Sequence, residues 1–385
     1  MAKSKTNSSI GGNDYYRIRA KIGEDADGKP LVKNFYGTGK KDAEAKRDAY
    51  LSDLRAGLDA DLGKQAVRDA MKSWLFEVKK RDNDLKDSSF ERYEGLFRIH
   101  IEASGFASIR TSEVKSMNVQ RYLNDLADKG YTHSQMKNSL KLLKMFFTYA
   151  LEQGYILKYP CPKSLSLPGE KPKKQIIETF SDDEVARLKK ALVGHRLRLL
   201  VLMGLGTGLR RGELLALKYE DIKDGKVEVS KTLSTPMIMD KDGVGERVVT
   251  IGQPKSESSN RKVPLPTELL REIESHRLAQ TKERMAAGIG GKSEYIFTTA
   301  TGQLYDGTNI HTAFARLLKK AGIPHKKFHV LRHTFATRLV RSNKVPLPVV
   351  QEMMGHSRLE TTMIYVDVND DDKIEAAQVL NYLFK

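Results

Sequence analysis

Residues 207–214 read Thr-Gly-Leu-Arg-Arg-Gly-Glu-Leu, and residues 329–334 read His-Val-Leu-Arg-His-Thr. Both stretches belong to the last segment of the chain, which otherwise shows helical spacing of apolar residues and one strand-rich stretch. On a helix, side chains at i, i+3 and i+4 share one face, which places His329, Arg332 and His333 together. The pattern predicts a mostly helical segment that carries a cluster of hydrogen-bond donors.

Three further side chains, Arg210, Lys255 and His356, would extend this cluster if the fold brings them to one point. Guanidinium forks match the paired oxygens of a phosphate, and imidazoles with a pKa of about 6.5 can pass protons. Such a pocket suits the negative charge that builds on a phosphoryl group during transfer. The stretches contain no pair of carboxylates to hold two metal ions. Transfer without metal requires a protein nucleophile, and Tyr365 follows His356 closely.

The histidine pair also has a metal-binding interpretation. His329 and His333 could be two zinc ligands one helical turn apart, but no glutamate lies between them and no third ligand is evident. The chain also has no G-x-x-x-x-G-K-[ST] loop and no paired G-x-G-x-x-G for a nucleotide. We therefore expect no metal ion and no other cofactor.

Composition limits the class of protein. At roughly 150 residues per domain, 385 residues predict two or three domains. Apolar residues make up 39% of the chain, and no window approaches the roughly 20 consecutive apolar residues of a membrane span. The first residues show no export signal, and the single cysteine, Cys161, excludes a disulfide framework or a multi-cysteine metal site. We expect a cytoplasmic protein without a membrane partner.

The net charge of the chain is the composition value that says most about its partner. Sixty-six Lys and Arg residues against 49 Asp and Glu residues leave a net charge of +17, spread over every segment. Such an excess favours an anionic partner, and nucleic acid first. A soluble and merely basic protein is the plainer alternative.

The first segment predicts a small α+β module at residues 1–62, with a three-stranded sheet and one helix. Apolar and basic residues alternate from Tyr15 in YYRIRAKIG, turn residues follow in EDADGKP, and LVKNFYG resumes the strand pattern. Helical spacing of apolar residues comes next, after Gly39. Basic side chains on the strands are candidate DNA contacts, although they could simply solvate an outer face: Arg17, Arg19 and Lys33.

The second segment predicts an all-α domain at residues 65–160. Helical patterns cover residues 67–80, 88–103, 114–128 and 134–152. The last pattern places Leu140, Leu143, Phe147 and Leu151 on an apolar stripe and basic residues opposite it. The basic face suits contact with a DNA backbone, and a solvated face is equally compatible with it: Lys137, Lys141 and Lys144.

Residues 161–175 predict a linker, because prolines and lysines accumulate there without apolar periodicity. Residues 176–385 predict a mixed, mainly α domain with a small antiparallel sheet at 226–265. Ser181 and Glu184 form the pattern of a capping box at the first helix of this domain. A tail helix is expected at 374–383.

The chain resembles the tyrosine recombinase (phage integrase) family, and its arrangement is similar to the three-domain integrases of bacteriophage lambda and of conjugative transposons. The likeness is very specific in residues 200–370, moderate in 14–60 and loose in 65–160. Four motifs carry it: T-G-L-R-R-G-E-L at 207–214, a lysine before S-x-R-x-V-P-L at 259–265, H-V-L-R-H-T-F-A-T at 329–337 and G-H-S-R-L-E-T-T-M-I-Y at 355–365.

This resemblance implies roles for the clustered side chains. It implies that Tyr365 is the nucleophile, that Glu213 supports Arg210 structurally, and that His333 is a supporting neighbour. The T-G-L-R match selects Arg210 over the adjacent Arg211. The activating set that the resemblance implies is Arg210, Lys255, His329, Arg332 and His356.

Lys255 has competitors, because Arg261 and Lys262 lie on the same expected hairpin. By resemblance, Lys255 would be the acid toward the leaving 5′-oxygen, with His329 assisting proton transfer. A tyrosine hydroxyl has a pKa of about 10, so Tyr365 must lose its proton as it attacks.

The resemblance implies a site-specific recombinase that integrates and excises a mobile element. A 3′-phosphotyrosine would retain the bond energy, so that a 5′-hydroxyl could reseal it without ATP or metal. The expected partners are double-stranded DNA at core-type and arm-type attachment sites, the protein itself as a tetramer on paired sites, an excision factor and a DNA-bending protein. The alternatives are a type IB topoisomerase-like relaxing enzyme and a catalytically inactive DNA-binding regulator.

Overall fold

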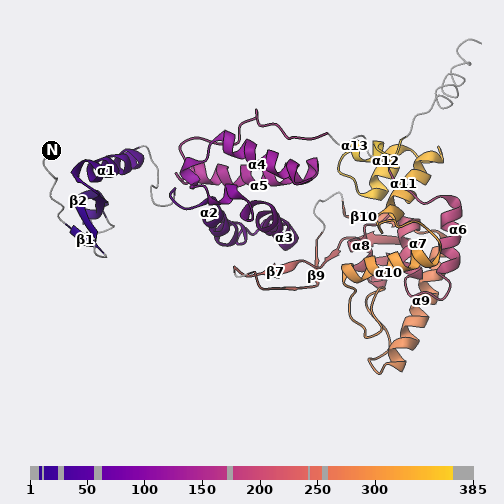
Figure 1. Ribbon diagram of the computed structural model, residues 1–385. Coiled ribbons are helices and arrows are strands. Elements are labelled where there is room, and N and C mark those ends of the chain that lie inside the picture. Colours follow the sequence, from indigo (N-terminus) through magenta and orange to yellow (C-terminus); the bar gives the residue numbers. More distant parts are fainter. Residues whose placement is uncertain are drawn as a thin grey trace, which may run out of the picture. The chain divides into compact units, whose positions relative to one another are not determined.

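The computed structural model describes residues 8–10, 13–24, 30–55, 63–170, 177–241, 243–253 and 259–366. Lys255 and the expected tail helix lie outside the described residues. The chain divides into two compact units: unit 1 is Met1–Lys173 with Ile238–Gly245, and unit 2 is Lys174–Met237 with Glu246–Lys385. Figure 1 labels the helices and strands. Among the described helices, none combines the length and apolar character needed to cross a bilayer.

Unit 1 begins with a three-stranded antiparallel sheet of order β1-β2-β3, made by β1 (Ser8–Ile10), β2 (Asn13–Glu24) and β3 (Pro30–Gly37). Helix α1 (Lys40–Arg55) packs against β2 and β3. The rings of Phe35 and Tyr50 meet edge to face at 5.3 Å, and Ala20 and Ile22 pack beside them. Aromatic residues from sheet and helix therefore build the small core.

The basic residues of this sheet lie on two different faces. Arg17 and Arg19 are exposed on one face of β2. Lys33 pairs with Ala20, and its Nζ lies 4.6 Å from the ring centre of Tyr50. Because directly paired residues share a face, Lys33 belongs to the side that α1 covers. The basic side chains expected on the strands therefore do not form one continuous face.

The rest of unit 1 is mostly helical. Its core is built around Trp74, Phe146 and Phe147, with centroid distances of 5.7 Å from Trp74 to Phe146 and 5.1 Å between the two phenylalanines. The four expected helices are present, and the first two end in π-helical turns. The elements are α2 (Val67–Ser73), η1 (Trp74–Lys79), α3 (Asp87–Leu96), η2 (Phe97–Glu102), η3 (Gly105–Ser108), η4 (Thr111–Glu113), α4 (Ser116–Asp128) and α5 (His133–Glu152).

The apolar stripe predicted for α5 is found except at its end. Leu140, Leu143 and Phe147 are buried, whereas Leu151 is 40% exposed because it lies in the last turn of the helix. On the other side, Lys137 and Lys141 are exposed, and Lys144 is half-buried.

The first part of the expected linker is packed against unit 1. Cys161 is buried, and Leu165 and Leu167 lie against the helical core. The side-chain amide of Gln120 on α4 donates to the carbonyl of Ser166 at 2.9 Å and accepts from its N–H at 3.0 Å. Apolar residues between the prolines thus fix residues 161–167 on the helices.

Unit 2 is mainly helical with small antiparallel sheets, one of order β10-β5-β4 and one pair of β6 with β9. A further pair, β7 with β8, includes residues that unit 1 contributes from Ile238–Gly245. Residues 287–306, between α9 and α10, contain a β-bridge between Thr298 and Leu304. The elements are α6 (Asp182–Ala191), α7 (Arg198–Thr207), α8 (Arg211–Leu215), η5 (Tyr219–Asp221), β4 (Ile222–Lys223), β5 (Lys226–Val229), β6 (Thr232–Ser234), β7 (Met237–Met239), β8 (Gly245–Arg247), β9 (Thr250–Gly252), β10 (Arg261–Pro264), α9 (Thr267–Ala286), α10 (Gly307–Lys320), α11 (Val330–Arg341), α12 (Leu347–Met354) and α13 (Glu360–Met363).

Local sequence features determine where α6 begins and how closely α11 approaches α7. The capping box at α6 is confirmed, because Glu184 N–H donates to Ser181 Oγ at 3.1 Å and Ser181 N–H donates to Glu184 Oε2 at 2.9 Å. Helix α11 packs against α7, and a Cβ on Gly204 would lie 3.1 Å from Leu331. This close approach places the polar face of α11 beside the C-terminal end of α7.

Candidate active site

The C-terminal turn of α12 binds three arginine side chains, each from a different element. The carbonyls of residues 353–355 accept one hydrogen bond each: from Arg261 Nε of β10 at 2.7 Å, from Arg332 Nη2 of α11 at 2.6 Å and from Arg210 Nη2 at 3.1 Å. The last carbonyls of a helix lack partners within the helix and carry partial negative charge, which favours cations there. Gly355, at φ 62°, ends the helix in the left-handed conformation.

Glu213 joins two of these arginines. Its Oε1 accepts from Arg210 Nη1 at 2.8 Å and its Oε2 accepts from Arg261 Nη2 at 2.8 Å, while the residue is 2% exposed. Burial alone would raise the pKa of Glu213, but the hydrogen bonds and charges of Arg261 and Arg210 lower it. The carboxylate therefore stays ionised and holds both guanidinium groups.

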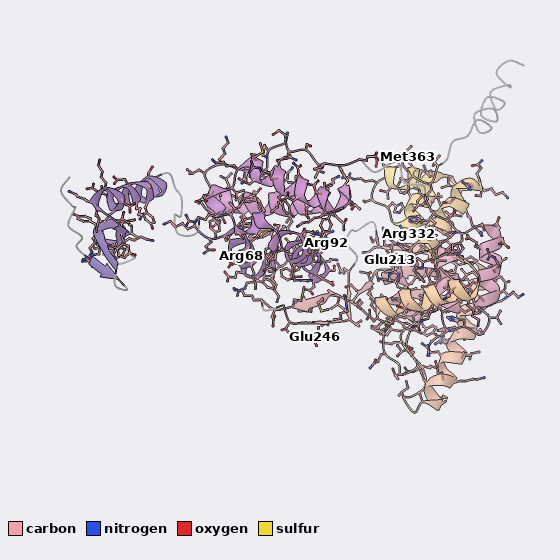
Figure 2. The ribbon with its side chains drawn as sticks, viewed as in Figure 1. Arg68, Arg92, Glu213, Glu246, Arg332 and Met363 are labelled. Atoms are coloured by element: carbon pink, nitrogen blue, oxygen red, sulfur yellow. The ribbon has the colours of Figure 1, made fainter. Side chains whose placement is uncertain are left out.

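Arg332 is held between the C-terminal ends of two helices. Besides its bond to α12, its Nη1 donates to the carbonyl of Gly208, which follows α7, at 2.7 Å. Gly208 has a φ of 64°, and a Cβ there would lie 2.3 Å from Phe335. Desolvation, followed by the charge of Arg210, lowers the pKa of Arg332 to about 9. Glu213 and Arg332, labelled in Figure 2, thus approach the cluster from α8 and α11.

Tyr365 is 5% exposed and follows α13. Its hydroxyl lies 2.8 Å from Nδ1 of His333, and its ring stacks on that of His356 with 6.4 Å between centres and 8° between planes. Burial raises the pKa of Tyr365, whereas the charges of Arg332 and Arg210 oppose that rise. The phenol is protonated at neutral pH and is held against an imidazole.

Two further histidines complete the cluster as neutral groups. The ring of His329, at the start of α11, stands perpendicular to that of His333 at 4.7 Å. The Nδ1 of His356 lies 2.9 Å from Thr362 Oγ1. Desolvation and nearby positive charges, those of Arg332 and Arg210 included, lower the pKa of both His329 and His356 to about 4.

The structure brings together seven of the side chains singled out in the sequence: Arg210, Glu213, His329, Arg332, His333, His356 and Tyr365. Lys255 lies outside the described residues, and the six basic residues considered as DNA contacts belong to unit 1. Arg261 was not assigned a role, although it is the arginine of the S-x-R-x-V-P-L motif. In the described part of the chain, no three His, Cys, Asp or Glu side chains gather as metal ligands.

This arrangement has a definite chemical capacity. Arg210 and Arg332 supply fixed positive charge, His329 and His356 supply neutral imidazoles, and Tyr365 supplies a hydroxyl group. Cationic donors that are already positioned can stabilise charge on a transferring phosphoryl group without reorganisation during the reaction.

Comparison with known proteins gives results that agree with this chemistry. Residues 178–372 match the model of the phage integrase family. The XerC-like tyrosine recombinase of Caldanaerobacter subterraneus subsp. tengcongensis is 41% identical over 396 aligned residues, which cover 100% of each chain.

Two solved structures show that the fold is shared. The Tn1549 transposon integrase in complex with transposon right end DNA has a TM-score of 0.64 at 24% identity and covers 83% of this chain and 100% of its own. A lambda integrase tetramer bound to a Holliday junction has a TM-score of 0.56 at 16% identity, covering 89% of this chain and 91% of its own.

Proposed function

The chain belongs to the phage integrase family of tyrosine recombinases, and we propose that it is a site-specific DNA recombinase that integrates and excises a mobile element. Tyr365 attacks a DNA phosphate and forms a 3′-phosphotyrosine. A 5′-hydroxyl from a partner strand then reseals the break. The bond energy is retained in the intermediate, so no ATP is required.

The observation that carries this proposal is the position of Tyr365 in the cluster that contains Arg210 and Arg332. His356 stacks on its ring, and the carbonyl of the preceding Gly355 binds Arg210. A phosphate that displaces the backbone carbonyls from the two guanidinium groups would gain bidentate, charge-assisted hydrogen bonds. In this proposal Glu213 positions Arg210, His329 and His356 assist, and Lys255 protonates the leaving oxygen.

Exposed basic side chains of unit 1 support DNA as the partner. We assign DNA contacts to Arg17 and Arg19 of the sheet and to Lys137 and Lys141 of α5, all of which are exposed. Lys33 and Lys144, which are less exposed, are weaker candidates. The N-terminal module would bind arm-type sites and the helices core-type sites, with a tetramer acting on paired sites. An excision factor and a DNA-bending protein would set the direction of the reaction.

The test uses the full chain and DNA selected from a random-sequence duplex pool by binding to the Tyr365→Phe variant. The parent should form a covalent complex with this DNA that survives a denaturing gel and persists in millimolar EDTA. Tyr365→Phe should bind but form none, whereas the matched control Tyr93→Phe, changed in unit 1, should react as the parent does. Covalent product from Tyr365→Phe would refute the assignment.

A second measurement separates recombination from simple relaxation. Two duplexes of different length that carry the selected site should yield hybrid products. A topoisomerase-like enzyme would relax plasmids without exchanging strands between duplexes, and an inactive regulator would do neither.

A further inference from the structure

The proposed cleavage step requires a group that accepts the phenolic proton of Tyr365. One side chain already contacts the phenolic oxygen. Nδ1 of His333 lies 2.8 Å from the Tyr365 hydroxyl, well within the distance that proton transfer needs. The two side chains are 32 residues apart in sequence and come from α11 and from the turn after α13. The contact therefore results from the fold and not from local chain geometry.

The surroundings of His333 favour its neutral form. The imidazole is half-buried, and desolvation together with the charge of Arg332 lowers its pKa, while Glu178 opposes the shift. The ring of His329 stands against it at 4.7 Å. At neutral pH the ring is uncharged, and the tautomer with the proton on Nε2 leaves Nδ1 as the acceptor for the phenol.

Other polar groups around Tyr365 are less suited to this task. The Nδ1 of His356 is engaged with Thr362 Oγ1. Arg332 and Arg210 carry only donors. His329 contacts the ring of His333. Among these described side chains, His333 is the one that pairs an acceptor atom with the nucleophilic oxygen.

We propose that His333 is the base that takes the phenolic proton of Tyr365 during strand cleavage and returns it during rejoining. The bond from Tyr365 Oη to phosphorus forms as the bond from phosphorus to the 5′-oxygen breaks. The phenolic proton moves to Nδ1 and leaves an imidazolium. The 5′-oxygen takes its proton from a separate acid, which is Lys255 in the proposed function. In rejoining, the 5′-hydroxyl attacks phosphorus and gives its proton back to the deprotonated form of that acid. The bond from Tyr365 Oη to phosphorus breaks, and the imidazolium returns its proton to the Tyr365 oxygen.

This assignment rests on the proposed function and extends the supporting role of His333 to that of a catalytic residue. It separates the base from the acid: one serves the nucleophile and the other the leaving group. The two roles can be distinguished with a 5′-bridging phosphorothiolate, because sulfur is a good leaving group and requires no acid, whereas the phenol still requires a base.

The experiment measures single-turnover formation of the covalent complex by full-length His333→Asn, His333→Ala and parent protein on the selected duplex. The asparagine Oδ1 can occupy the place of Nδ1 and accept a hydrogen bond, but it cannot act as a base at neutral pH. His195→Asn, between α6 and α7, is the matched control. Footprinting and melting temperature establish that each variant binds DNA and folds.

We expect His333→Asn to bind as the parent does and to cleave about 100- to 10,000-fold more slowly at pH 7.5, the range that general base catalysis contributes. Its rate should rise with pH as hydroxide replaces the missing base, and the phosphorothiolate should not restore it. The parent rate should level off once His333 is neutral. His333→Ala should be at least as slow as His333→Asn.

Three outcomes would overturn the assignment. Cleavage by His333→Asn within about threefold of the parent would show that the hydrogen bond only positions the phenol. Recovery on the phosphorothiolate would make His333 an acid. If His333→Asn fails to bind DNA or to fold, and His333→Gln restores full cleavage, the role of His333 is structural. If Tyr365→Phe itself gives covalent product, the proposed function fails first, and that result is distinct from all three.

Discussion

Glu213→Gln should destabilise unit 2 much more than a surface substitution does. The side chain of Glu213 is 2% exposed and that of its partner Arg261 is 3% exposed, so a neutral amide leaves a buried guanidinium without its counter-charge. Removing one partner of a buried ion pair costs about 3–5 kcal/mol. In a unit of this size about 1 kcal/mol shifts the melting midpoint by about 2–4 °C, so we expect a fall of about 6–20 °C.

The chain contains an internal reference for this measurement. Its single tryptophan, Trp74, is buried in unit 1, so tryptophan fluorescence reports the unfolding of that unit. Far-ultraviolet circular dichroism follows the helices of both units. Glu213→Gln should lower the midpoint of the circular dichroism transition that belongs to unit 2 and leave the fluorescence midpoint unchanged.

The pH dependence gives a further check on the same variant. The folded state lowers the pKa of Glu213 from 4.5, so the carboxylate stabilises the fold above about pH 4.5 and loses this effect as the pH falls through the folded value. The difference between parent and variant should therefore shrink in acid. Glu220→Gln, at an exposed carboxylate, is the control and should change little. A midpoint for Glu213→Gln within about 1 °C of the parent would refute the reasoning.

Three further predictions concern other parts of the molecule. Gly208→Ala should lower the unit 2 midpoint and slow covalent-complex formation, because its Cβ would strike Phe335 and its φ is 64°; an unchanged gel and melt would contradict this. In the parent, unit 2 should lose stability as the pH falls from about 6.5 toward 4. The pKa of His329 and His356 is about 4 in the folded state and about 6.5 in the unfolded chain, so the unfolded chain binds more protons in this range. His356→Asn should flatten that dependence in a melting series against pH, and an unchanged slope would oppose it. Removing residues 1–64 should preserve cleavage of the core-type site and abolish binding to a second class of site; identical footprints from both proteins would exclude separate binding modules.

Local patterns in the sequence predict much of the fold. The apolar spacing predicts the last helix of unit 1 at 134–152, and the structure has it at His133–Glu152, because this spacing and the Thr132 cap are local signals. The capping box at α6 is equally local. By contrast, Leu151 keeps the apolar spacing but lies beyond the core, since the period does not tell where the neighbouring helices end.

The candidate site was only partly predictable. Motifs identify the side chains at α8, at α11 and in the segment after α12, but Arg261 and Lys262 look alike as neighbouring bases on a strand. Strand alternation separates them: Arg261 shares the buried face with Val263, and Lys262 points outward. The contact of His333 with Tyr365 had no signal in the sequence, because it depends on how the turn after α12 returns to α11.

The three arginines at the end of α12 make the length of that turn matter more than its composition. Met353 and Met354 are successive helical residues, which are rotated by about 100°, and Gly355 leaves the helix in the left-handed conformation. The three carbonyls therefore face different directions, and each is matched by an arginine from a separate element. Most side chains in the turn could change without moving these oxygens. Inserting or deleting one residue would misalign all three at once. Related chains should therefore vary in sequence through this turn while keeping its residue count, and a transplanted active site must include β10, the start of α8, α11 and the end of α12 as one unit.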